Sequence, residues 1–431
     1  MNPLAQELNE KIKLHDPHVY EMLSDLGKAL YFPKGILSQT AEAKAKATRY
    51  NATIGIATEN GGPMHLGLFD DLLPGLEPAD LYPYAPPAGK PALRQAWREH
   101  LIRHNPSLQG KKFGLPIATN ALTHGLSIAA DLFAGPGDTL VLPDKYWGNY
   151  NLTFGVRRGA TVKTHRTFDD RGRYDVGALE AALGELRGRK AIVLLNFPNN
   201  PTGYTPGEAE AAGIVSVLKN AAEAGTNLVV ILDDAYFGLF YEDSIKESLF
   251  GRLAGLHPRI LPVKVDGATK EEFVWGFLVG FITFAAGSDE TLAALEAKAT
   301  GCIRGTISTG PHPSQTLVLK ALQSPLFETQ RKEKEAILRE RAAKVKSLLD
   351  SGKYGDAWEY YPFNSGYFMC LKLNGVDAEA LRTHLLEAYG VGTISIGSTD
   401  LRVAFSCVDL PDIEPLFDLI YQGYLDLRQK S

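Results

Sequence analysis

Two stretches in the middle of the chain are apolar at every position, instead of at every second one. They cover residues 191–195 and, after the polar Asn227, the rest of 227–232, and polar turn residues bound both of them. A strand that is apolar all round is covered on both faces, as in a parallel sheet with helices on either side. Residues 208–224, which lie between them, have helical periodicity and predict the connecting helix.

The alternation continues on both sides of these two stretches. An apolar helix is predicted over residues 126–133, a short buried strand over 138–142 and a further apolar run over 273–284. Earlier in the chain, residues 91–103 predict a helix with a proline at its start, where the missing N–H costs little. The pattern predicts an α/β domain whose sheet is mostly parallel and flanked by helices.

The pattern changes beyond residue 325. Residues 332–349 predict a long, charged amphipathic helix. After it, two strands over 366–373 and 399–405 enclose a helix over 377–389. We therefore expect residues 326–431 to form a smaller α+β domain.

Ahead of the α/β domain, the N-terminal segment has elements of its own. Residues 3–22 and 41–50 have helical periodicity, and the β-branched run 51–57 predicts a strand that enters a turn. We expect three parts in the chain: an N-terminal segment, a large domain and a small domain, over residues 1–60, 61–325 and 326–431.

Composition narrows the class of protein. A chain of 431 residues is long for a single core, which favours more than one domain. The 45 basic and 50 acidic residues give a net charge of -5, which argues against binding to nucleic acid or to an anionic membrane. The three cysteines lack metal-ligand spacing, so no metal site is predicted. No run reaches the ~20 apolar residues of a membrane helix, and we expect a cytoplasmic protein.

Three stretches carry candidate chemistry, and their order along the chain is specific. They are residues 196–203 (Asn-Phe-Pro-Asn-Asn-Pro-Thr-Gly), residues 232–236 (Leu-Asp-Asp-Ala-Tyr) and residues 266–280, which contain Lys270, Gly276 and Gly280. Together they resemble the core of fold-type I enzymes that use pyridoxal 5'-phosphate (PLP), of the class I/II aminotransferase kind. The resemblance runs from Asn51 to Arg402.

The resemblance implies a large domain with a mostly parallel, seven-stranded sheet and a smaller α+β domain, which the N-terminal segment folds back to join. It also implies a homodimer whose active sites are shared between subunits. Lys270 matches the lysine whose amine forms a Schiff base with the PLP aldehyde. A lysine beside Glu271 and Glu272 is more often a surface residue, and only the neighbouring motifs favour the catalytic role.

Several other positions match residues that hold the cofactor ring. Asp233 matches the carboxylate that keeps the pyridine nitrogen protonated, while Asp234 is the competing candidate. Side chains alternate along a strand, so only one of the two faces the ring. Tyr236 and Asn200 match the donors to the phenolic oxygen, and Trp147 matches the stacking aromatic residue. A turn around Asn200 and a core position for Trp147 are the simpler structural interpretations.

The phosphate site follows the family pattern in some positions and departs from it in others. Thr123 and Leu122 precede an apolar helix, where backbone N–H groups and a hydroxyl bind phosphate. Tyr84 matches a tyrosine that reaches the phosphate of the neighbouring subunit, and Thr269 offers a further hydroxyl.

The departures concern charge and hydroxyl groups. The family has an arginine eight residues after the lysine, where this chain has Leu278, and a serine three residues before it, where this chain has Gly267. Three interpretations stay open: another cationic side chain compensates, the cofactor binds weakly, or the protein does not need it.

Substrate binding is predicted to use two arginines. Arg402 matches the residue that clamps the substrate α-carboxylate through two parallel hydrogen bonds, and its alternative is a sheet-edge ion pair with Asp400. Arg304 resembles an arginine that crosses from the partner subunit to a side-chain carboxylate, or it is structural. Asn200 and Trp147 would also face the substrate.

These residues lead to a functional hypothesis with two alternatives. We expect a PLP-dependent aminotransferase that moves an amino group between an L-amino acid, with acidic or aromatic ones favoured, and a 2-oxo acid. A PLP-dependent decarboxylase or lyase would share every anchor named above. A non-catalytic protein on the same scaffold has Leu278 as its support.

Overall fold

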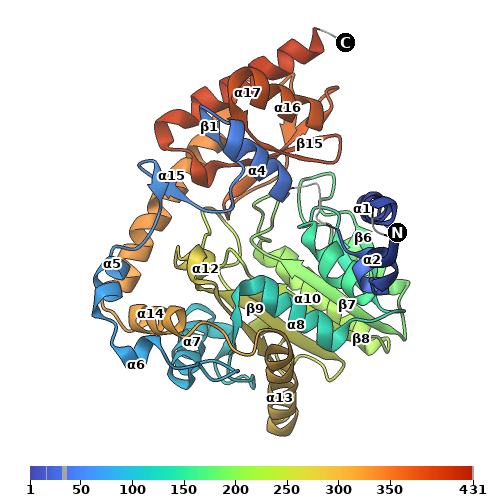
Figure 1. The fold of residues 1–431 in the computed structure, drawn as a ribbon, viewed down its shortest axis with the longest axis vertical. Helices are drawn as coiled ribbons and strands as arrows, with labels where there is room; N and C mark the ends of the chain where they lie inside the picture. The colour runs from blue at the N-terminus through green and yellow to red at the C-terminus, as the bar shows by residue number, and fades with distance from the viewer. Residues whose placement is uncertain (16, 32–35, 430–431) are drawn as a thin grey trace.

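The computed structural model describes residues 1–15, 17–31 and 36–429. A seven-stranded sheet forms the centre of its larger part (Figure 1). The strand order is β4-β10-β9-β8-β7-β5-β6, and every pairing is parallel except those of β10 with its two neighbours. The strands are β4 (Ile117–Asn120), β5 (Thr139–Pro143), β6 (Thr161–His165), β7 (Lys190–Asn196), β8 (Asn227–Asp233), β9 (Ile260–Gly267) and β10 (Val279–Phe284).

The central strands are buried along almost their whole length. In β7 and β8 every residue after the first is buried, so helices must cover both faces of the sheet. Helix α8 packs against β8, β9 and β10, and helix α10 packs against β8 and β9. The helices of this part include α7 (Pro91–His104), α8 (Ala121–Phe133), α9 (Val176–Gly184), α10 (Glu208–Glu223), α11 (Leu249–Leu253), α13 (Asp289–Thr306) and α14 (His312–Leu322).

The parallel strands present their carboxyl ends at one edge of the sheet. Asn196, the last residue of β7, is in register with Asp233, the last residue of β8. Polar groups that end neighbouring parallel strands meet at the edge where α/β proteins bind ligands. The predicted site residues of these two strands are therefore brought together by the sheet itself.

The second part contains a four-stranded antiparallel sheet in the order β11-β12-β15-β14. In Figure 1 it lies above the large sheet, and α15 runs from one part to the other. Its elements are α15 (Phe327–Asp350), β11 (Trp358–Tyr360), β12 (Phe368–Leu373), α16 (Ala378–Tyr389), β14 (Ile394–Ile396), β15 (Asp400–Ala404) and α17 (Ile413–Arg428).

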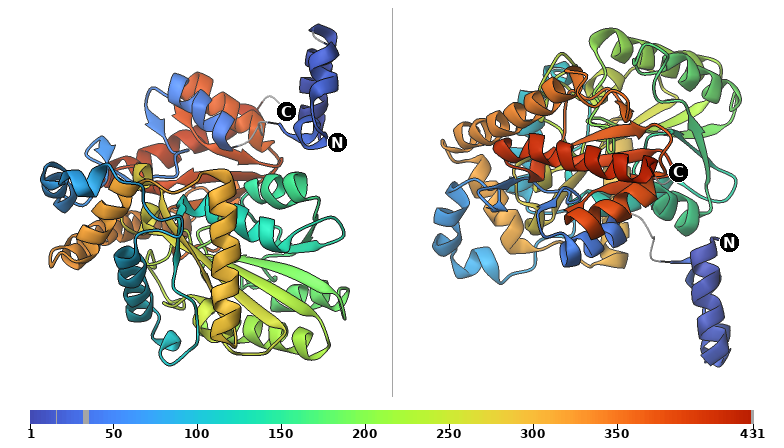
Figure 2. Two further views of the ribbon diagram at one scale, coloured as in Figure 1. Left: turned by 60° about the horizontal axis from the view of Figure 1, so that its bottom comes forward. Right: turned by 90° about the horizontal axis from the view of Figure 1, so that it is seen from above.

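The N-terminal segment contacts this second part along α4 (Ile36–Lys46) and β1 (Tyr50–Asn51). Strand β1 pairs in parallel with β13 (Val391–Gly392), and α4 packs against α16, β13 and β14. Helices α1 (Pro3–His15) and α2 (Pro17–Met22) stand apart from the rest of the molecule in both views of Figure 2.

Two local predictions differ from the structure in the N-terminal segment. The helix expected over 41–50 ends at Lys46, and the strand expected over 51–57 is reduced to Tyr50–Asn51. The Asn51 side chain accepts hydrogen bonds from the Thr53 backbone N–H and hydroxyl, which turns the chain out of the strand. Asn is a turn former, and here its side chain outweighs the β-branched neighbours.

The apolar run 273–284 also differs, because it is only half strand. Residues Trp275–Phe277 form a 3₁₀ turn, Leu278 has a left-handed backbone with φ 52°, and β10 begins at Val279. Apolarity alone does not separate a buried turn from a buried strand. In the part of the chain that is described, no helix is both long enough and apolar enough to span a bilayer.

Candidate active site

A cavity of about 280 Å³ lies at the carboxyl edge of the large sheet, between that sheet and the second part of the molecule. It takes its walls from β7, β8, the start of α8, the turn that carries Lys270, residues 53–55 and the strands β12 and β15. Eight of the eleven predicted site residues line it: Leu122, Thr123, Trp147, Asn200, Asp233, Tyr236, Lys270 and Arg402.

Asp233 is buried at the end of β8, with 2% of its surface exposed. Tyr150 donates from its hydroxyl to Asp233 Oδ2 over 2.6 Å, and the Ala235 N–H donates to Oδ1 over 3.2 Å. Burial raises the pKa of Asp233 to about 6, although the Tyr150 hydrogen bond and the nearby Lys270 charge both oppose that rise. A buried carboxylate of this kind is stabilised by a bound cationic group.

The adjacent Asp234 has a different environment. Its carboxylate forms an ion pair with the buried Lys264. Lys264 also lies 3.3 Å from Asp266, which accepts a hydrogen bond from the Trp97 indole N–H over 3.2 Å. Asp233 therefore faces the cavity, and Asp234 belongs to a buried charge network outside its lining.

Lys270 lies on α12 (Ala268–Glu271), a single helical turn after β9. Its amine is 5.6 Å from the centroid of the Tyr236 ring, and its carbonyl accepts a hydrogen bond from the Tyr367 hydroxyl over 3.2 Å. Burial lowers the pKa of Lys270, against the opposing charge of Asp233. A lowered pKa raises the fraction of free amine at neutral pH, which is the reactive form.

Gly267 begins this turn, at the position where the family has serine. A Cβ at Gly267 would lie 2.5 Å from the Cα of Gly280. Because β9 and β10 approach so closely here, a side chain has no room. The missing serine thus has a structural reason.

Arg402 lies in β15 with 1% of its surface exposed. It donates to Asn200 Oδ1 over 3.0 Å and to the Thr53 carbonyl over 2.9 Å, and its guanidinium lies 4.1 Å from the Phe368 ring centroid. Its Nε has no hydrogen-bond partner among the described residues. Burial lowers the pKa of Arg402, and an anionic ligand would restore the favoured charged form.

The first turn of α8 lies directly against the start of β10. The Ala121 N–H donates to the Leu278 carbonyl over 2.8 Å, and a Cβ at Gly280 would lie 2.6 Å from the Ala121 backbone. The Leu278 side chain is 43% exposed. The cationic residues in the described cavity lining are Lys270 and Arg402, whose predicted roles are in cofactor attachment and substrate binding. No further guanidinium in that lining takes the place of the family's phosphate arginine.

Three of the predicted residues lie outside the cavity lining. Thr269 is buried, and its hydroxyl has no hydrogen-bond partner within the described ranges. Tyr84 is 90% exposed, in the loop before α7. Arg304 is exposed near the end of α13 and donates to the Ser308 hydroxyl over 2.5 Å.

The cavity also contains residues that the sequence prediction missed. Tyr150 bonds Asp233, and the Asn196 side chain donates to the Asp233 carbonyl over 2.8 Å and accepts from the Asn200 N–H over the same distance. Phe368 packs on both Arg402 and Tyr236. Asn196 could have been predicted from the sequence, because it is the polar residue that ends the apolar strand before β8. No sequence pattern marks Tyr150 or Phe368 as site residues.

The sequence profile of aminotransferase class I and II matches residues 77–420, which is most of the chain. The chain belongs to the class I and II aminotransferases. This class depends on PLP and transfers amino groups between amino acids and 2-oxo acids. The prediction of family, cofactor and enzymatic activity from the sequence is confirmed.

Similar proteins agree with this assignment. The chain is 27% identical over 338 residues to the aspartate/prephenate aminotransferase of Cereibacter sphaeroides, covering 74% of this chain and 78% of the relative. It is 25% identical over 278 residues to the aspartate aminotransferase of a Bacillus species, covering 64% and 66%. For some other relatives the match is shorter: it covers about half of the length of the Thermotoga maritima aspartate aminotransferase, at 26% identity.

Solved aminotransferases share the fold. An aminotransferase of Anaerococcus prevotii has a TM-score of 0.80 at 23% identity, over 91% of this chain and 96% of that one. A Thermus thermophilus aspartate aminotransferase mutant has a TM-score of 0.75 at 20% identity, over 93% and 99%. The predicted fold class is confirmed.

The cavity of this aminotransferase fits PLP in its donor set. It combines a buried carboxylate at Asp233, a buried amine at Lys270 and the amino end of α8. The Nε of Arg402 and the hydroxyl of Thr269 are buried without partners in the described part of the protein, so they retain hydrogen-bonding capacity.

Proposed function

We propose that the cavity around Lys270 is the active site and that it transfers the amino group of an L-amino acid, acidic by preference and aromatic next, to a 2-oxo acid. One observation supports the proposal above all others. Lys270, Asp233 and Arg402 come from three separate strands or turns, and all three line one buried cavity. They offer an amine, an anion and a cation, which are the groups that amino-acid chemistry with PLP needs.

Each cofactor-binding role is assigned to a residue of this chain. Asp233 would hold the protonated ring nitrogen, and Trp147 would stack on the ring. Tyr236 would donate to the phenolic oxygen together with the Asn200 amide, whose oxygen already accepts from Arg402. The Leu122 and Thr123 N–H groups and the Thr123 and Thr269 hydroxyls would bind the phosphate, with Tyr84 reaching it from the partner subunit.

Catalysis is assigned to the groups that face the substrate. PLP bound here supplies a sink for the electron pair that the substrate α-carbon releases. The Lys270 amine would take the proton from that carbon as a base and then deliver it, as an acid, to the aldehyde carbon of the cofactor. Arg402 holds the α-carboxylate through two parallel hydrogen bonds and so fixes the direction of the breaking bond.

The substrate class rests on relatives and on one arginine. The relatives named above act on aspartate or on aspartate and prephenate, and solved neighbours include an aromatic amino acid aminotransferase. Arg304 would reach a substrate side-chain carboxylate from the partner subunit. Its exposed position on α13, outside the cavity of its own chain, is compatible with that role.

A homodimer and a cytoplasmic location complete the proposal. Tyr84 at 90% and Ile307 at 38% exposure are aromatic or apolar groups that a second subunit would cover. The pairing of β1 with β13 supports the division into an N-terminal segment, a large domain and a small domain, over 1–60, 61–325 and 326–431.

A spectroscopic titration tests the reaction type. With PLP bound, L-aspartate or L-glutamate should convert the visible band of the lysine-bound cofactor to that of the amine form, with stoichiometric 2-oxo acid. Released carbon dioxide or an elimination product in place of the oxo acid would establish the decarboxylase or lyase alternative, which the comparisons do not favour. No visible band at saturating PLP would leave the non-catalytic alternative.

Leu278→Arg should tighten PLP binding by about 10–100-fold, because a charged contact to phosphate is worth about 1.5–3 kcal/mol. The exposed side chain leaves room for arginine, and the left-handed backbone is as strained with leucine as with arginine. The measurement is the PLP dissociation constant by absorbance titration. Leu410→Arg, at another exposed leucine, is the control, and equal tightening there would exclude a local effect.

Arg402→Lys should lower kcat/KM by about 10–100-fold with PLP affinity unchanged, because lysine cannot make two parallel hydrogen bonds to a carboxylate. Steady-state kinetics with L-aspartate measure the effect. Arg252→Lys is the matched control, since the Arg252 guanidinium pairs with Glu208 at the surface. Wild-type kcat/KM in Arg402→Lys would remove Arg402 from the substrate site.

A further inference from the structure

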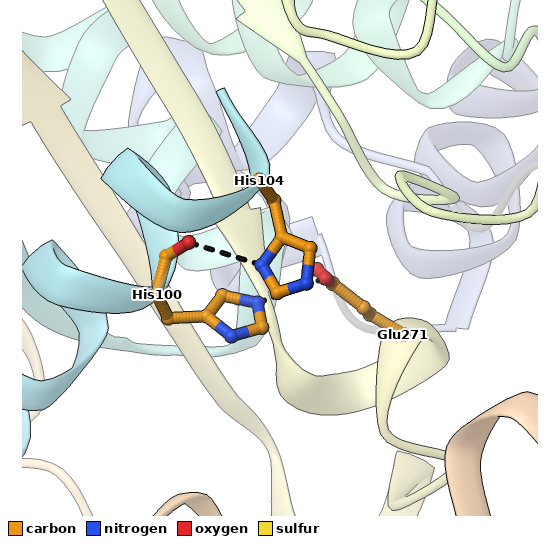
Figure 3. Close-up of side chains that lie close together, drawn as sticks. All are labelled: His100, His104 and Glu271. Atoms are coloured by element: carbon orange, nitrogen blue, oxygen red, sulfur yellow. Dashed lines mark hydrogen bonds and ion pairs between the residues drawn. The ribbon is translucent and has the colours of Figure 1, made fainter. Parts of the chain in front are cut away.

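A second cluster of reactive side chains lies next to the Lys270 turn but outside the cavity. His100 and His104 stand one turn apart on α7, and Glu271 ends α12 directly after Lys270. One ligand atom from each lies within 4.8 Å of the other two. Figure 3 shows both imidazole rings beside the Glu271 carboxylate. His100 Nε2 lies 2.9 Å from Glu271 Oε1, and both residues are 3% exposed.

The ring of His104 is held in a defined orientation. Its Nδ1 lies 3.0 Å from the His100 carbonyl, which can only accept, so Nδ1 carries the proton (Figure 3). The lone pair is then on Nε2. Metal-ligating histidines are typically held in this way, with the other ring nitrogen donating to a backbone carbonyl.

Glu328, near the start of α15, supplies a fourth candidate ligand atom beside these groups. Its Oε1 lies 3.6 Å from His104 Nε2 and is buried without a hydrogen-bond partner in the described ranges. Buried polar atoms are normally paired, so the unpaired Glu328 Oε1 beside His104 Nε2 is available to a further ligand.

Carboxyl groups outnumber guanidinium groups in this cluster. Glu271, Glu272 and Glu328 all lie within electrostatic range of Arg331, the one guanidinium among them. Arg331 already forms an ion pair with Glu328 over 3.2 Å, and Glu335 lies between Arg331 and Arg339. A divalent cation would therefore add positive charge mainly beside Glu271.

We propose that His100 Nε2, His104 Nε2, Glu271 and Glu328 bind one divalent transition metal ion, Zn²⁺ by preference. Two imidazoles with carboxylates are a donor set that Zn²⁺ takes with bonds of ~2.0–2.2 Å. A tetrahedral site of that size needs ligand atoms roughly 3.3 Å apart, so the His100, His104 and Glu271 atoms, now within 4.8 Å of one another, would move closer together on binding. Four protein ligands fill the coordination sphere, so the ion is structural and carries no reacting water.

The metal would connect three segments that meet at the catalytic lysine. Its ligands come from α7, from α12 and from α15, which leads into the second part of the molecule. Glu271 is the neighbour of Lys270, so binding would fix the turn that carries the amine. Sequence spacing gave no sign of the site because His100 and Glu271 are 171 residues apart.

Titration of the PLP-loaded protein with metal tests the proposal. After treatment with a chelator, the wild type should bind one Zn²⁺ per chain by calorimetry and give the visible ligand-field bands of four-coordinate Co²⁺. His104→Ala should weaken the affinity by at least about 100-fold, as the loss of a direct ligand exceeds the 10–100-fold effect of outer contacts. Zn²⁺ should raise the melting temperature of the wild type but not that of His104→Ala.

Two further variants make the result decisive. Glu328→Gln keeps the size of a side chain that is a third exposed, so it serves if His104→Ala does not fold. His384→Ala removes a histidine paired with Asp426, and it should bind Zn²⁺ as the wild type does. An absence of stoichiometric binding in the wild type, or equal affinity in wild type and both ligand variants, would overturn the proposal.

Discussion

Lys270→Ala should abolish amino-group transfer, lowering kcat by at least about 10⁴-fold, the upper range for loss of a general acid–base group. The effect exceeds that of other substitutions because one amine is assigned both the attachment of the cofactor and the movement of the proton. The cavity offers no second amine, since Lys270 is the one lysine in its described lining. Single-turnover absorbance with L-glutamate measures the remaining rate.

A loss of activity must be separated from a loss of structure. The Lys270 side chain lies over Tyr236 without an ion pair among the described residues, so alanine should leave the melting temperature near that of the wild type. Lys246→Ala, at a surface lysine that donates to the Glu242 carbonyl, should keep full activity. Normal transamination by Lys270→Ala would show that the lysine assignment is wrong.

The sequence predicted the fold because its signals are local. Strands β7 and β8 are apolar at nearly every position, and that pattern requires a sheet covered on both faces. Asp233 ends a strand of this sheet, and Asn200, Tyr236 and Lys270 each follow one, so the sheet topology brings them together without further information. Local pattern and shared topology explain why these residues could be predicted to lie together.

The remaining features depend on contacts between distant parts of the chain. Phe368 reaches the cavity from the second part of the molecule, and no neighbour in sequence marks it as a site residue. The absence of a side chain at Gly267 is explained only by its approach to Gly280 across two strands. The turn at Asn51 was missed for a different, local reason, because the Asn51 side chain competes with a β-branched run.

The assignment of the two adjacent aspartates needs both the local sequence pattern and the contacts seen in the structure. Alternation along a strand predicts that only one of Asp233 and Asp234 faces the ring, but it does not say which one. The structure places Asp233 in the cavity lining and pairs Asp234 with Lys264. Matched substitutions at the two positions therefore separate a chemical role from a structural one.

Asp233→Asn should lower kcat by about 10²–10³-fold, the range for loss of one electrostatic group aimed at the reacting system. An amide keeps the shape and the Tyr150 contact but cannot stabilise a cationic ring nitrogen. In the protein without PLP the Asp233 carboxyl has a pKa of about 6, so it becomes protonated as the pH falls below that value. PLP affinity of the wild type should therefore weaken below pH 6, and that dependence should disappear in Asp233→Asn.

Asp234→Asn should show the opposite behaviour, with kcat close to the wild-type value and a loss of about 1–3 kcal/mol in the free energy of unfolding. The buried Lys264 loses its nearest partner there but retains Asp266 at 3.3 Å, which limits the cost. Steady-state kinetics and denaturant unfolding of both variants measure the contrast. A larger fall in kcat for Asp234→Asn than for Asp233→Asn would reverse the assignment, because the carboxylate nearer the chemistry must give the larger kinetic effect.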